Sequence, residues 1–173
     1  MLQLVKKLLA GLGQFSVKMT EVKEDTGVLK LTNDDVIKKW EALKLKAYLP
    51  TPNDVPTIGW GHTHTTKMGQ VITVAEAQRL FDKDVAWAVE AVRKHVKVPL
   101  NVNQADAIIS WTFNIGEANM ASSTLVRKLN QGDYNAARKE LPRWNKQKGK
   151  TLRGLTNRRA EEVKLFFTPV GGK

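Results

Sequence analysis

Apolar residues return every three or four positions in several stretches of the chain, which is the spacing of one face of an α-helix. The longest such stretch includes Ala77, Leu80, Phe81, Val85, Ala88 and Val92. Proline and glycine residues end most of these stretches, because neither residue continues a helix well. The pattern predicts helices for about three turns after Asn33 and over residues 74–94, 104–115, 123–132, 133–142 and 158–167.

Polar side chains that cap helices stand at several of the predicted starts. Thr73 and Glu76 have the spacing of a capping box, in which each side chain accepts the other residue's backbone N–H. Asn103 precedes the second strongly apolar helix, and Ser122 or Ser123 precedes the next one. We therefore expect these helices to begin at these residues.

Residues 46–62 follow a different pattern, with turn-forming residues between short β-prone runs. Pro50, Pro52 and Pro56 surround an Asn-Asp pair, and a Thr-Ile run follows them. This pattern predicts a small irregular sheet, and residues 28–31 are a further candidate strand. The predicted fold class is α+β, with a small sheet lobe joined by a long helix to a larger helical lobe. A cleft between two lobes is a usual place for a substrate.

The N-terminal residues combine two lysines with an apolar run. One helical face collects Leu4, Val5, Leu8, Leu9, Leu12 and Phe15. A signal peptide also has a basic start and an apolar run, but Gln14 and Ser16 interrupt the run and no small-residue cleavage site follows. We interpret residues 1–19 as an amphipathic helix that packs on the body or rests on a membrane. A cleaved signal or a loose membrane anchor is the alternative. Residues 1–32 then form an extension to a domain over residues 33–173.

The chain is strongly basic, with 28 Lys and Arg against 17 Asp and Glu and a net charge of +11. Such a field favours polyanionic partners, namely nucleic acid, an anionic membrane or outer-membrane surface, or an acidic wall polymer. A basic surface that serves solubility is the alternative. Cysteine is absent, which excludes disulfides and thiolate metal sites. His62 and His64 have no third ligand nearby in the sequence, so we expect neither a metal nor a cofactor.

Glu41, Asp54 and Thr57 form the candidate catalytic group. Two carboxyl groups are the minimum for cleaving a glycosidic bond, because one protonates the leaving oxygen and the other activates water or stabilises positive charge. Glu41, near the end of the first helix, suits the acid role if the lobes shield it. Asp54 suits the second role, and the Thr57 hydroxyl can hold the attacking water. The alternatives are a solvated helix residue, a turn former and an ordinary strand residue.

Aromatic and glycine residues extend this candidate site. Trp60 and Phe113, together with Trp111 and Trp144, are candidates for stacking on sugar rings, although such residues also form cores. Gly61 would let the backbone come close to a ligand. A Ser-His-Asp relay lacks support, because no serine lies in a nucleophile elbow.

Four blocks of sequence follow one another between residues 33 and 167. They are Trp40-Glu41 with Ala47-Tyr48 and Thr57-Ile58-Gly59-Trp60-Gly61-His62-Thr63, then Ala75-Glu76 with Leu80-Phe81 and Asp84-Val85, then Asn103-Gln104 and Ala107 with Phe113-Asn114-Ile115-Gly116, and finally Trp144 with Gly154-Leu155-Thr156-Asn157-Arg158-Arg159. Each block alone is weak evidence. Together, in this order, they resemble the phage-type lysozyme or endolysin family, the muramidases with which bacteriophages lyse their hosts.

The resemblance implies a two-lobed lysozyme-like fold whose catalytic domain spans residues 33–173. It implies hydrolysis of the β-1,4 bond between N-acetylmuramic acid and N-acetylglucosamine in bacterial peptidoglycan, with inversion at the anomeric carbon. It also implies a protein made in the host cytoplasm that acts on the wall at lysis, delivered by a holin or by secretion. We expect a monomer.

The resemblance also implies roles for individual residues. It matches the family's acid to Glu41, its threonine to Thr57, and a structural histidine–carboxylate pair to His62 and Asp84. Arg158 matches a basic residue that approaches the acid from the last helix. The expected substrate-binding residues are Trp60, Gly61, His62, Phe113, Asn114, Gly116 and Arg158.

The second carboxylate departs from the family pattern. The pattern would place it at Pro50, which cannot act, whereas Asp54 lies only three residues before Thr57. Either Asp54 reaches the same place through a remodelled turn, or the second carboxylate is dispensable or supplied elsewhere.

Two further functions remain as hypotheses. A non-catalytic wall-binding or virion structural protein could keep the fold after losing the aspartate. A nucleic-acid binder is suggested only by the charge of +11, because no nucleic-acid motif accompanies it.

Overall fold

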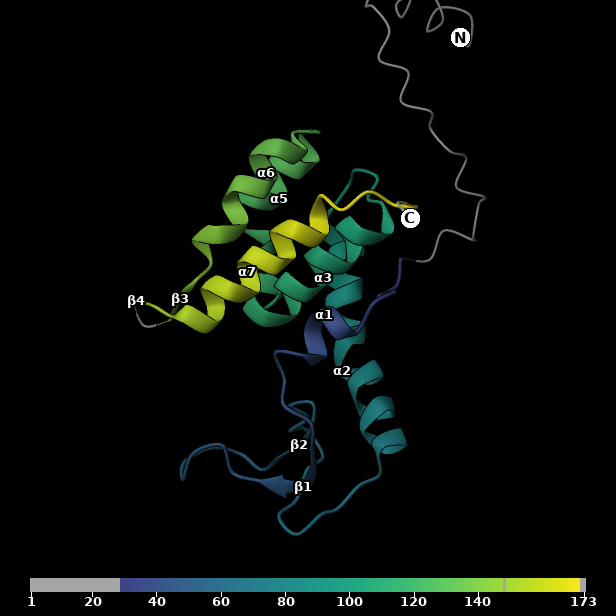
Figure 1. Cartoon of the computed structure of the whole chain (residues 1–173), viewed down its shortest axis with the longest axis vertical. Helices are drawn as coiled ribbons and strands as arrows, with labels where there is room; N and C mark the ends of the chain where they lie inside the picture. The colour runs from purple at the N-terminus through teal and green to yellow at the C-terminus, as the bar shows by residue number, and fades with distance from the viewer. Residues whose placement is uncertain (1–28, 148, 172–173) are drawn as a thin grey trace, which may run out of the picture.

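Two unequal lobes are joined by one long helix, α2 (Val74–His95) (Figure 1). The computed structural model describes residues 29–147 and 149–171. The smaller lobe contains β1 (Lys44–Tyr48) and β2 (Thr57–Gly59), and the larger one is helical. The predicted α+β class, with a small sheet lobe and a larger helical lobe, is confirmed.

The sheet of the smaller lobe is short and irregular. β1 and β2 pair antiparallel, with Lys44 opposite Gly59 and Tyr48 opposite Thr57, and the register shifts between these two pairs. Gly59 has φ +63°, and a Cβ built there would lie 3.6 Å from the Cβ of Ala77 on α2. Glycine therefore suits both the backbone conformation and the close approach of the strand to the helix. The small core of this lobe consists of Ala47, Ile58, Ile72 and Ala77.

α2 belongs to the cores of both lobes. Its start is the predicted capping box, in which the Glu76 carboxylate accepts the Thr73 N–H at 2.7 Å and the Thr73 hydroxyl accepts the Glu76 N–H at 3.2 Å. Ala77 packs in the sheet-lobe core, whereas Phe81 and Val92 pack in the helical-lobe core. The apolar face predicted from the sequence is thus the surface on which both lobes assemble.

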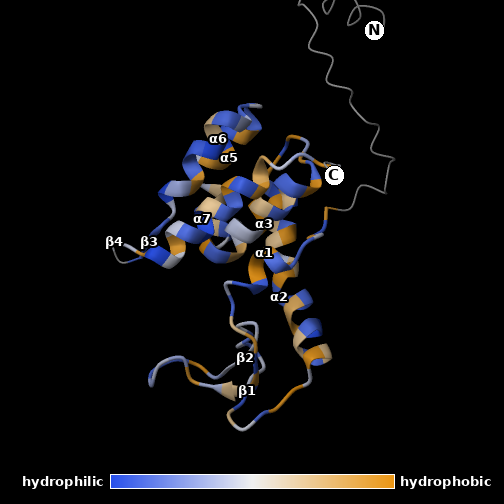
Figure 2. Cartoon of the chain, in the orientation of Figure 1, coloured by the Kyte–Doolittle hydropathy of each residue, from blue (hydrophilic) through white to orange (hydrophobic). Residues whose placement is uncertain are grey.

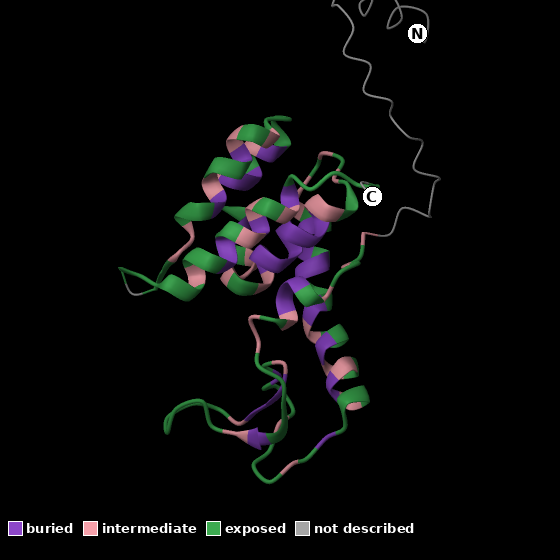
Figure 3. Cartoon of the chain, in the orientation of Figure 1, coloured by how far each residue is buried: buried purple, intermediate pink, exposed green. Residues whose placement is uncertain are grey.

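α3 (Val102–Ile115) is the centre of the helical lobe. Every residue from Ala105 to Thr112 is buried, and Figure 3 shows this stretch as continuously buried. Figure 2 shows more hydrophobic residues along α3 than along the outer helices. The elements around it are α4 (Glu117–Ala121), α5 (Thr124–Asn130), α6 (Tyr134–Glu140), a 3-10 helix (Leu141–Arg143), a hairpin of β3 (Lys146–Gln147) and β4 (Lys150–Thr151), and α7 (Arg153–Phe166).

The first and last helices differ in length from the sequence-based prediction. α1 (Asp35–Lys38) is a single turn rather than three, because the chain leaves the helix there to enter the sheet lobe. Leu43, which a three-turn helix would place on its apolar face, is 38% exposed. α7 starts at Arg153, five residues before the predicted start at Arg158.

The cap of α3 was also misplaced. Asn101, not Asn103, is the N-cap, and it forms a capping box with Gln104. The side-chain amide of Asn103 instead donates to the carbonyl of Thr168 at 2.8 Å. α4 and the β3–β4 hairpin were not predicted, because both are too short to give a periodic signal.

Residues 29–32 lie on the helical lobe in an irregular conformation, so the strand predicted over residues 28–31 is absent from its described part, residues 29–31. Thr32 anchors them by donating its N–H and its hydroxyl to Asp106, at 2.7 and 2.6 Å. Burial raises the pKa of Asp106, and the two Thr32 bonds oppose that rise. The helix predicted over residues 1–19 lies outside the described residues. Among the described residues, no helix is long and apolar enough to cross a membrane.

Candidate active site

Glu41 lies between the lobes, after α1 and before β1. Its N–H donates to the carbonyl of Lys38 at 3.1 Å, which extends the turn beyond α1. Its Oε1 lies 3.1 Å from Nη1 of Arg158 on α7, and its side chain is 29% exposed. A Cβ built at Gly61 would lie 3.7 Å from Oε2 of Glu41. The carboxyl group is therefore fixed on one side by α7, borders the turn after β2 on the other, and remains partly open to solvent.

Gly61 keeps that turn clear of a side chain. Its φ is +90°, a conformation that other residues rarely adopt. A side chain there would also point toward the Glu41 carboxyl, because the nearest atom to a Cβ at Gly61 is Glu41 Oε2. Gly61 is thus a shape-determining residue beside the acid.

Thr57 begins β2 and is only 5% exposed. Its hydroxyl donates to the carbonyl of Val55 at 3.1 Å. A hydroxyl has one proton to donate and two lone pairs to accept with, so Thr57 Oγ1 remains able to accept a hydrogen bond from a water molecule.

Asp54 is exposed in the loop between β1 and β2, which extends sideways from the sheet lobe (Figure 1). Its contacts lie within its own turn. Its N–H donates to the carbonyl of Thr51 at 3.0 Å, and its Oδ2 accepts the Thr51 hydroxyl at 2.9 Å. The structure therefore brings Glu41, Gly61 and Arg158 together. Asp54 instead forms hydrogen bonds within its own turn, as its Asn-Asp turn sequence predicted.

His62 is buried and ties the sheet lobe to α2. Its Nδ1 lies 2.9 Å from both carboxylate oxygens of Asp84, and its Nε2 lies 2.8 Å from the hydroxyl of Thr65. The backbone N–H of Thr65 also donates to Nε2, at 3.3 Å. These partners suit a neutral imidazole whose Nδ1–H donates to Asp84 and whose Nε2 accepts. Both ring nitrogens are thus engaged within the chain, as expected of a structural pair, and the role of His62 in substrate binding stays a prediction.

The aromatic candidates pack partly against α2. The Trp60 ring meets the edge of Phe81 with centroids 5.9 Å apart, and Phe113 stacks on Trp87 at 5.9 Å. Both Trp60 and Phe113 are only partly buried and flank the helical-lobe core. Each ring therefore contributes to packing and keeps part of its surface available.

Asn114 lies at the C-terminal end of α3 beside a pocket of about 310 Å³. The pocket is also lined by Trp144 and by residues of the β3–β4 hairpin and the start of α7. Gly116, with φ +86°, ends α3 and allows α4 to start in a new direction. Gly116 therefore sets, through its backbone, the angle at which α4 leaves α3.

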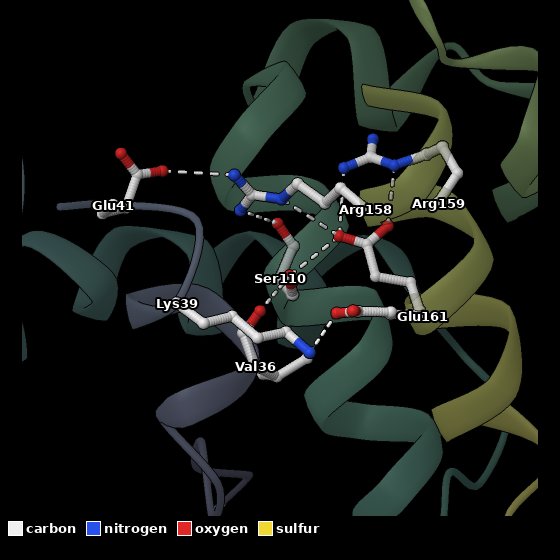
Figure 4. Close-up of polar contacts among 8 residues, drawn as sticks. Val36, Lys39, Glu41, Ser110, Arg158, Arg159 and Glu161 are labelled. Atoms are coloured by element: carbon white, nitrogen blue, oxygen red, sulfur yellow. Dashed lines mark hydrogen bonds and ion pairs between the residues drawn. The ribbon is translucent and has the colours of Figure 1, made fainter. Parts of the chain in front are cut away.

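Arg158 reaches Glu41 from a buried position. Its side chain is only 4% exposed, its Nη2 donates to the carbonyl of Ser110 at 3.3 Å, and its Nε donates to Glu162 at 3.4 Å. Figure 4 shows Glu41 and Arg158 facing each other, with Ser110 below the Arg158 side chain and Arg159 on the side away from Glu41. The expected approach of a basic residue to Glu41 from the last helix is present.

Glu162, Arg159 and Ser110 were not singled out from the sequence. Glu162 accepts the Ser110 hydroxyl at 2.8 Å and forms an ion pair with Arg159 at 2.9 Å. Burial raises the pKa of Glu162, and burial lowers the pKa of Arg159 to about 10. The available signal was the spacing Arg-Arg-x-x-Glu, which puts both arginines within one helical turn of the carboxylate. Nothing in that spacing alone indicates that the three side chains face inward.

Comparison with known sequences connects this arrangement to one family. The family model described as phage lysozyme matches residues 38–162. The endolysin of Acyrthosiphon pisum secondary endosymbiont phage 1 is 44% identical over 135 residues, which cover 76% of this chain and 92% of that protein. The endolysin of Bacillus phage PZA is 42% identical over 134 residues, and there the match covers 76% of this chain but only 52% of the relative.

Comparison with solved structures gives the same result. An endolysin from the Escherichia coli O157:H7 phage FAHEc1 superposes with a TM-score of 0.75 and 36% sequence identity. The match covers 85% of this chain and 99% of that one. The overall fold of the chain is therefore similar to that of a solved endolysin.

The His62–Asp84 contact should contribute measurably to stability. In Asp84→Ala the buried Nδ1–H of His62 loses its acceptor, so we expect the free energy of unfolding in urea to fall by about 1–3 kcal/mol. Asp82→Ala is the matched control, because it removes an exposed carboxylate from the same helix. An equal loss in both variants would contradict a specific role for the pair.

Proposed function

The chain belongs to the phage lysozyme family and is a peptidoglycan-degrading muramidase, and on that premise we propose that Glu41 is its general acid. The observation that supports this assignment is the position of its carboxyl group between the lobes, paired with a buried arginine and partly open to solvent. A general acid must reach the glycosidic oxygen, so it needs an open face. After the proton has been delivered, Arg158 is in place to stabilise the carboxylate that remains.

Asp54 and Thr57 are proposed to act on the attacking water molecule. In this scheme Thr57 accepts a hydrogen bond from the attacking water, and the Asp54 carboxylate activates that water or stabilises the positive charge of the oxocarbenium-like transition state. Two features support the scheme: the free accepting capacity of the Thr57 hydroxyl and the exposure of Asp54. The Asp54 turn has to approach the substrate for this to occur, and the loop that carries it belongs to the same lobe as Gly61.

The glycan strand is proposed to lie between the sheet-lobe turn at Gly61 and the helical-lobe wall that includes Phe113, Asn114 and Gly116. Support comes from the partial exposure of the Phe113 ring and the exposed position of Asn114. The excess of basic residues would attract the chain to anionic wall polymers or membrane surfaces. The comparisons give no support to the non-catalytic alternative.

A membrane contact is proposed for residues 1–19. Support comes from the sequence alone: an apolar face from Leu4 to Phe15 lies beside Lys6 and Lys7, a combination typical of helices that lie on anionic bilayers. This contact would concentrate the enzyme at the membrane before it reaches the wall.

Replacing Glu41 should abolish most of the activity. Glu41→Gln keeps the size of the side chain but cannot donate the proton, so we expect the rate of peptidoglycan turbidity loss to fall by about 10²–10⁴-fold. Release of reducing ends measures the same step chemically. Glu90→Gln, on the exposed side of α2, controls for loss of a carboxylate. Full lysis by a folded Glu41→Gln protein would remove Glu41 from the acid role.

The role of Asp54 can be separated from the structure of its turn. We expect Asp54→Asn to lower the rate of reducing-end release roughly tenfold or more, because it removes the negative charge. Thr51→Val is the matched control, since it removes the hydroxyl that bonds Asp54 while leaving the carboxylate. If Thr51→Val loses as much activity as Asp54→Asn, or if neither loses any, Asp54 serves only the turn.

Membrane contact can be tested in the full chain by co-sedimentation with phosphatidylglycerol-containing vesicles. The double variant Leu8→Glu and Leu12→Glu places charges on the apolar face, so we expect it to lose vesicle binding. The double variant Gln3→Glu and Gln14→Glu adds the same charge on the opposite side of the predicted helix and should bind like the unchanged protein. Equal binding by all three proteins would rule out this role.

A further inference from the structure

The carboxylate of Glu162 lies in the interior of the helical lobe, with no exposed side-chain surface. It bridges two elements, because it accepts the Ser110 hydroxyl from α3 at 2.8 Å and pairs with Arg158 and Arg159 on its own helix. A buried carboxylate without such partners would be strongly disfavoured. The cluster around Glu162 is therefore a connected network of buried polar groups that joins α3 to α7.

The charges of this cluster do not cancel. Arg158 and Arg159 bring two positive charges against one negative charge on Glu162, and both guanidinium groups are almost fully buried. The remaining positive charge is paired with Glu41, whose Oε1 lies 3.1 Å from Nη1 of Arg158. The buried network thus connects to the active site through one side chain.

The geometry of Arg158 depends on three anchors in three directions. Its Nε faces Glu162 at 3.4 Å, its Nη2 faces the carbonyl of Ser110 at 3.3 Å, and its Nη1 faces Glu41. A guanidinium group is planar and rigid, so fixing Nε and Nη2 determines where Nη1 points. Without the anchor at Nε, the group can rotate about its stem, and the repulsion between Arg158 and Arg159 is no longer offset.

We propose that Glu162 is a positioning residue for the reaction, which holds Arg158 in the orientation that fixes the Glu41 carboxyl. This inference rests on the proposed role of Glu41. Glu162 is not a catalytic residue, because its side chain is enclosed in the core and its partners are Ser110, Arg158 and Arg159. It acts only through Arg158, and Ser110 and Arg159 support it: Ser110 by its hydroxyl bond and Arg159 by balancing the buried negative charge.

A purely structural role makes a different prediction. If Glu162 only joins α3 to α7, its removal should have the same effect whether or not Arg158 is present. If it acts through Arg158, its effect on turnover should vanish once Arg158 has been removed. A double-mutant cycle separates the two cases, because it measures the coupling between residues directly.

The cycle consists of the unchanged protein, Glu162→Gln, Arg158→Met and the double variant, assayed on solubilised peptidoglycan strands. We expect Glu162→Gln to lower kcat roughly tenfold while KM changes less than about twofold, since the residue orients the acid and does not bind sugar. In the Arg158→Met background, Glu162→Gln should change kcat by less than about twofold. An equal loss of kcat in both backgrounds, or no loss in either, would overturn the proposal.

A milder variant keeps the test decisive if Glu162→Gln does not fold. Ser110→Ala removes the hydroxyl bond to Glu162 at 2.8 Å, together with the longer contact of the same hydroxyl with the Val36 carbonyl at 3.5 Å, and leaves every charge in place. We expect it to lower kcat about two- to fivefold, and this effect should also disappear in the Arg158→Met background. Circular dichroism and thermal unfolding confirm that each variant is folded under the assay conditions.

Glu161→Gln is the matched control on the same helix. Glu161 pairs with Lys39 and so joins α7 to the segment after α1 without contacting Arg158. It should keep full kcat, and a loss equal to that of Glu162→Gln would overturn the proposal. The proposed role of Glu41 and the proposed role of Glu162 can be rejected independently of each other. Full activity in Glu41→Gln would reject the proposed function, whereas an inactive Glu41→Gln with no coupling between Glu162 and Arg158 would reject only the positioning role.

Discussion

The ion pair between Glu41 and Arg158 is the contact on which the arrangement of the site depends. It joins the segment that leaves α1 to a helix that lies 117 residues later in the chain. The segment around Glu41 leads directly into the sheet lobe. Without this contact, the position of Glu41 would be set only by the short connector between the lobes. Because Arg158 belongs to a buried helix face, Glu41 is fixed to the larger lobe. A group held in this way keeps its orientation at no further entropic cost when substrate binds.

The sheet lobe must then be held in a fixed relation to that anchored acid. α2 does so through contacts near its first three turns: Gly59 approaches Ala77 closely, and His62 pairs with Asp84. Both contacts come from the strand and turn that also contain Thr57 and Gly61. The strand and turn with Thr57 and Gly61 are therefore positioned by α2, and Glu41 is positioned by α7. α3 packs against both helices, which makes its fully buried middle section their common support.

The sequence predicted best what depends on neighbouring residues. α2 was predicted almost to its last residue, because its capping box and its apolar face are both local. α1 was overestimated, because its apolar spacing continues to Trp40 while the tertiary structure requires the chain to turn at Lys38. The cap of α3 was misplaced because two asparagines with cap chemistry stand two residues apart, and only Asn101 has its partner Gln104 at the right distance. The approach of Arg158 to Glu41 was expected only from the resemblance to the phage-type lysozyme family. The buried position of Glu162 was not predicted, since a charged residue in an Arg-Arg-Ala-Glu-Glu run is typical of a solvated helix face.

A buried ionic cluster is weak evidence for stability, because apolar residues of similar volume often stabilise a core equally well. The cluster at Glu162 makes physical sense as an arrangement that presents one buried positive charge to Glu41. A lone arginine aimed outward from an apolar helix face would lose its orientation or its hydration. Arg158 avoids both because its Nε and Nη2 donate to Glu162 and to the Ser110 carbonyl, while its Nη1 donates to Glu41. Arg159 is then needed to balance Glu162, whose ionised form burial alone would disfavour. The second arginine and the buried glutamate are thus consequences of placing the first arginine beside the acid.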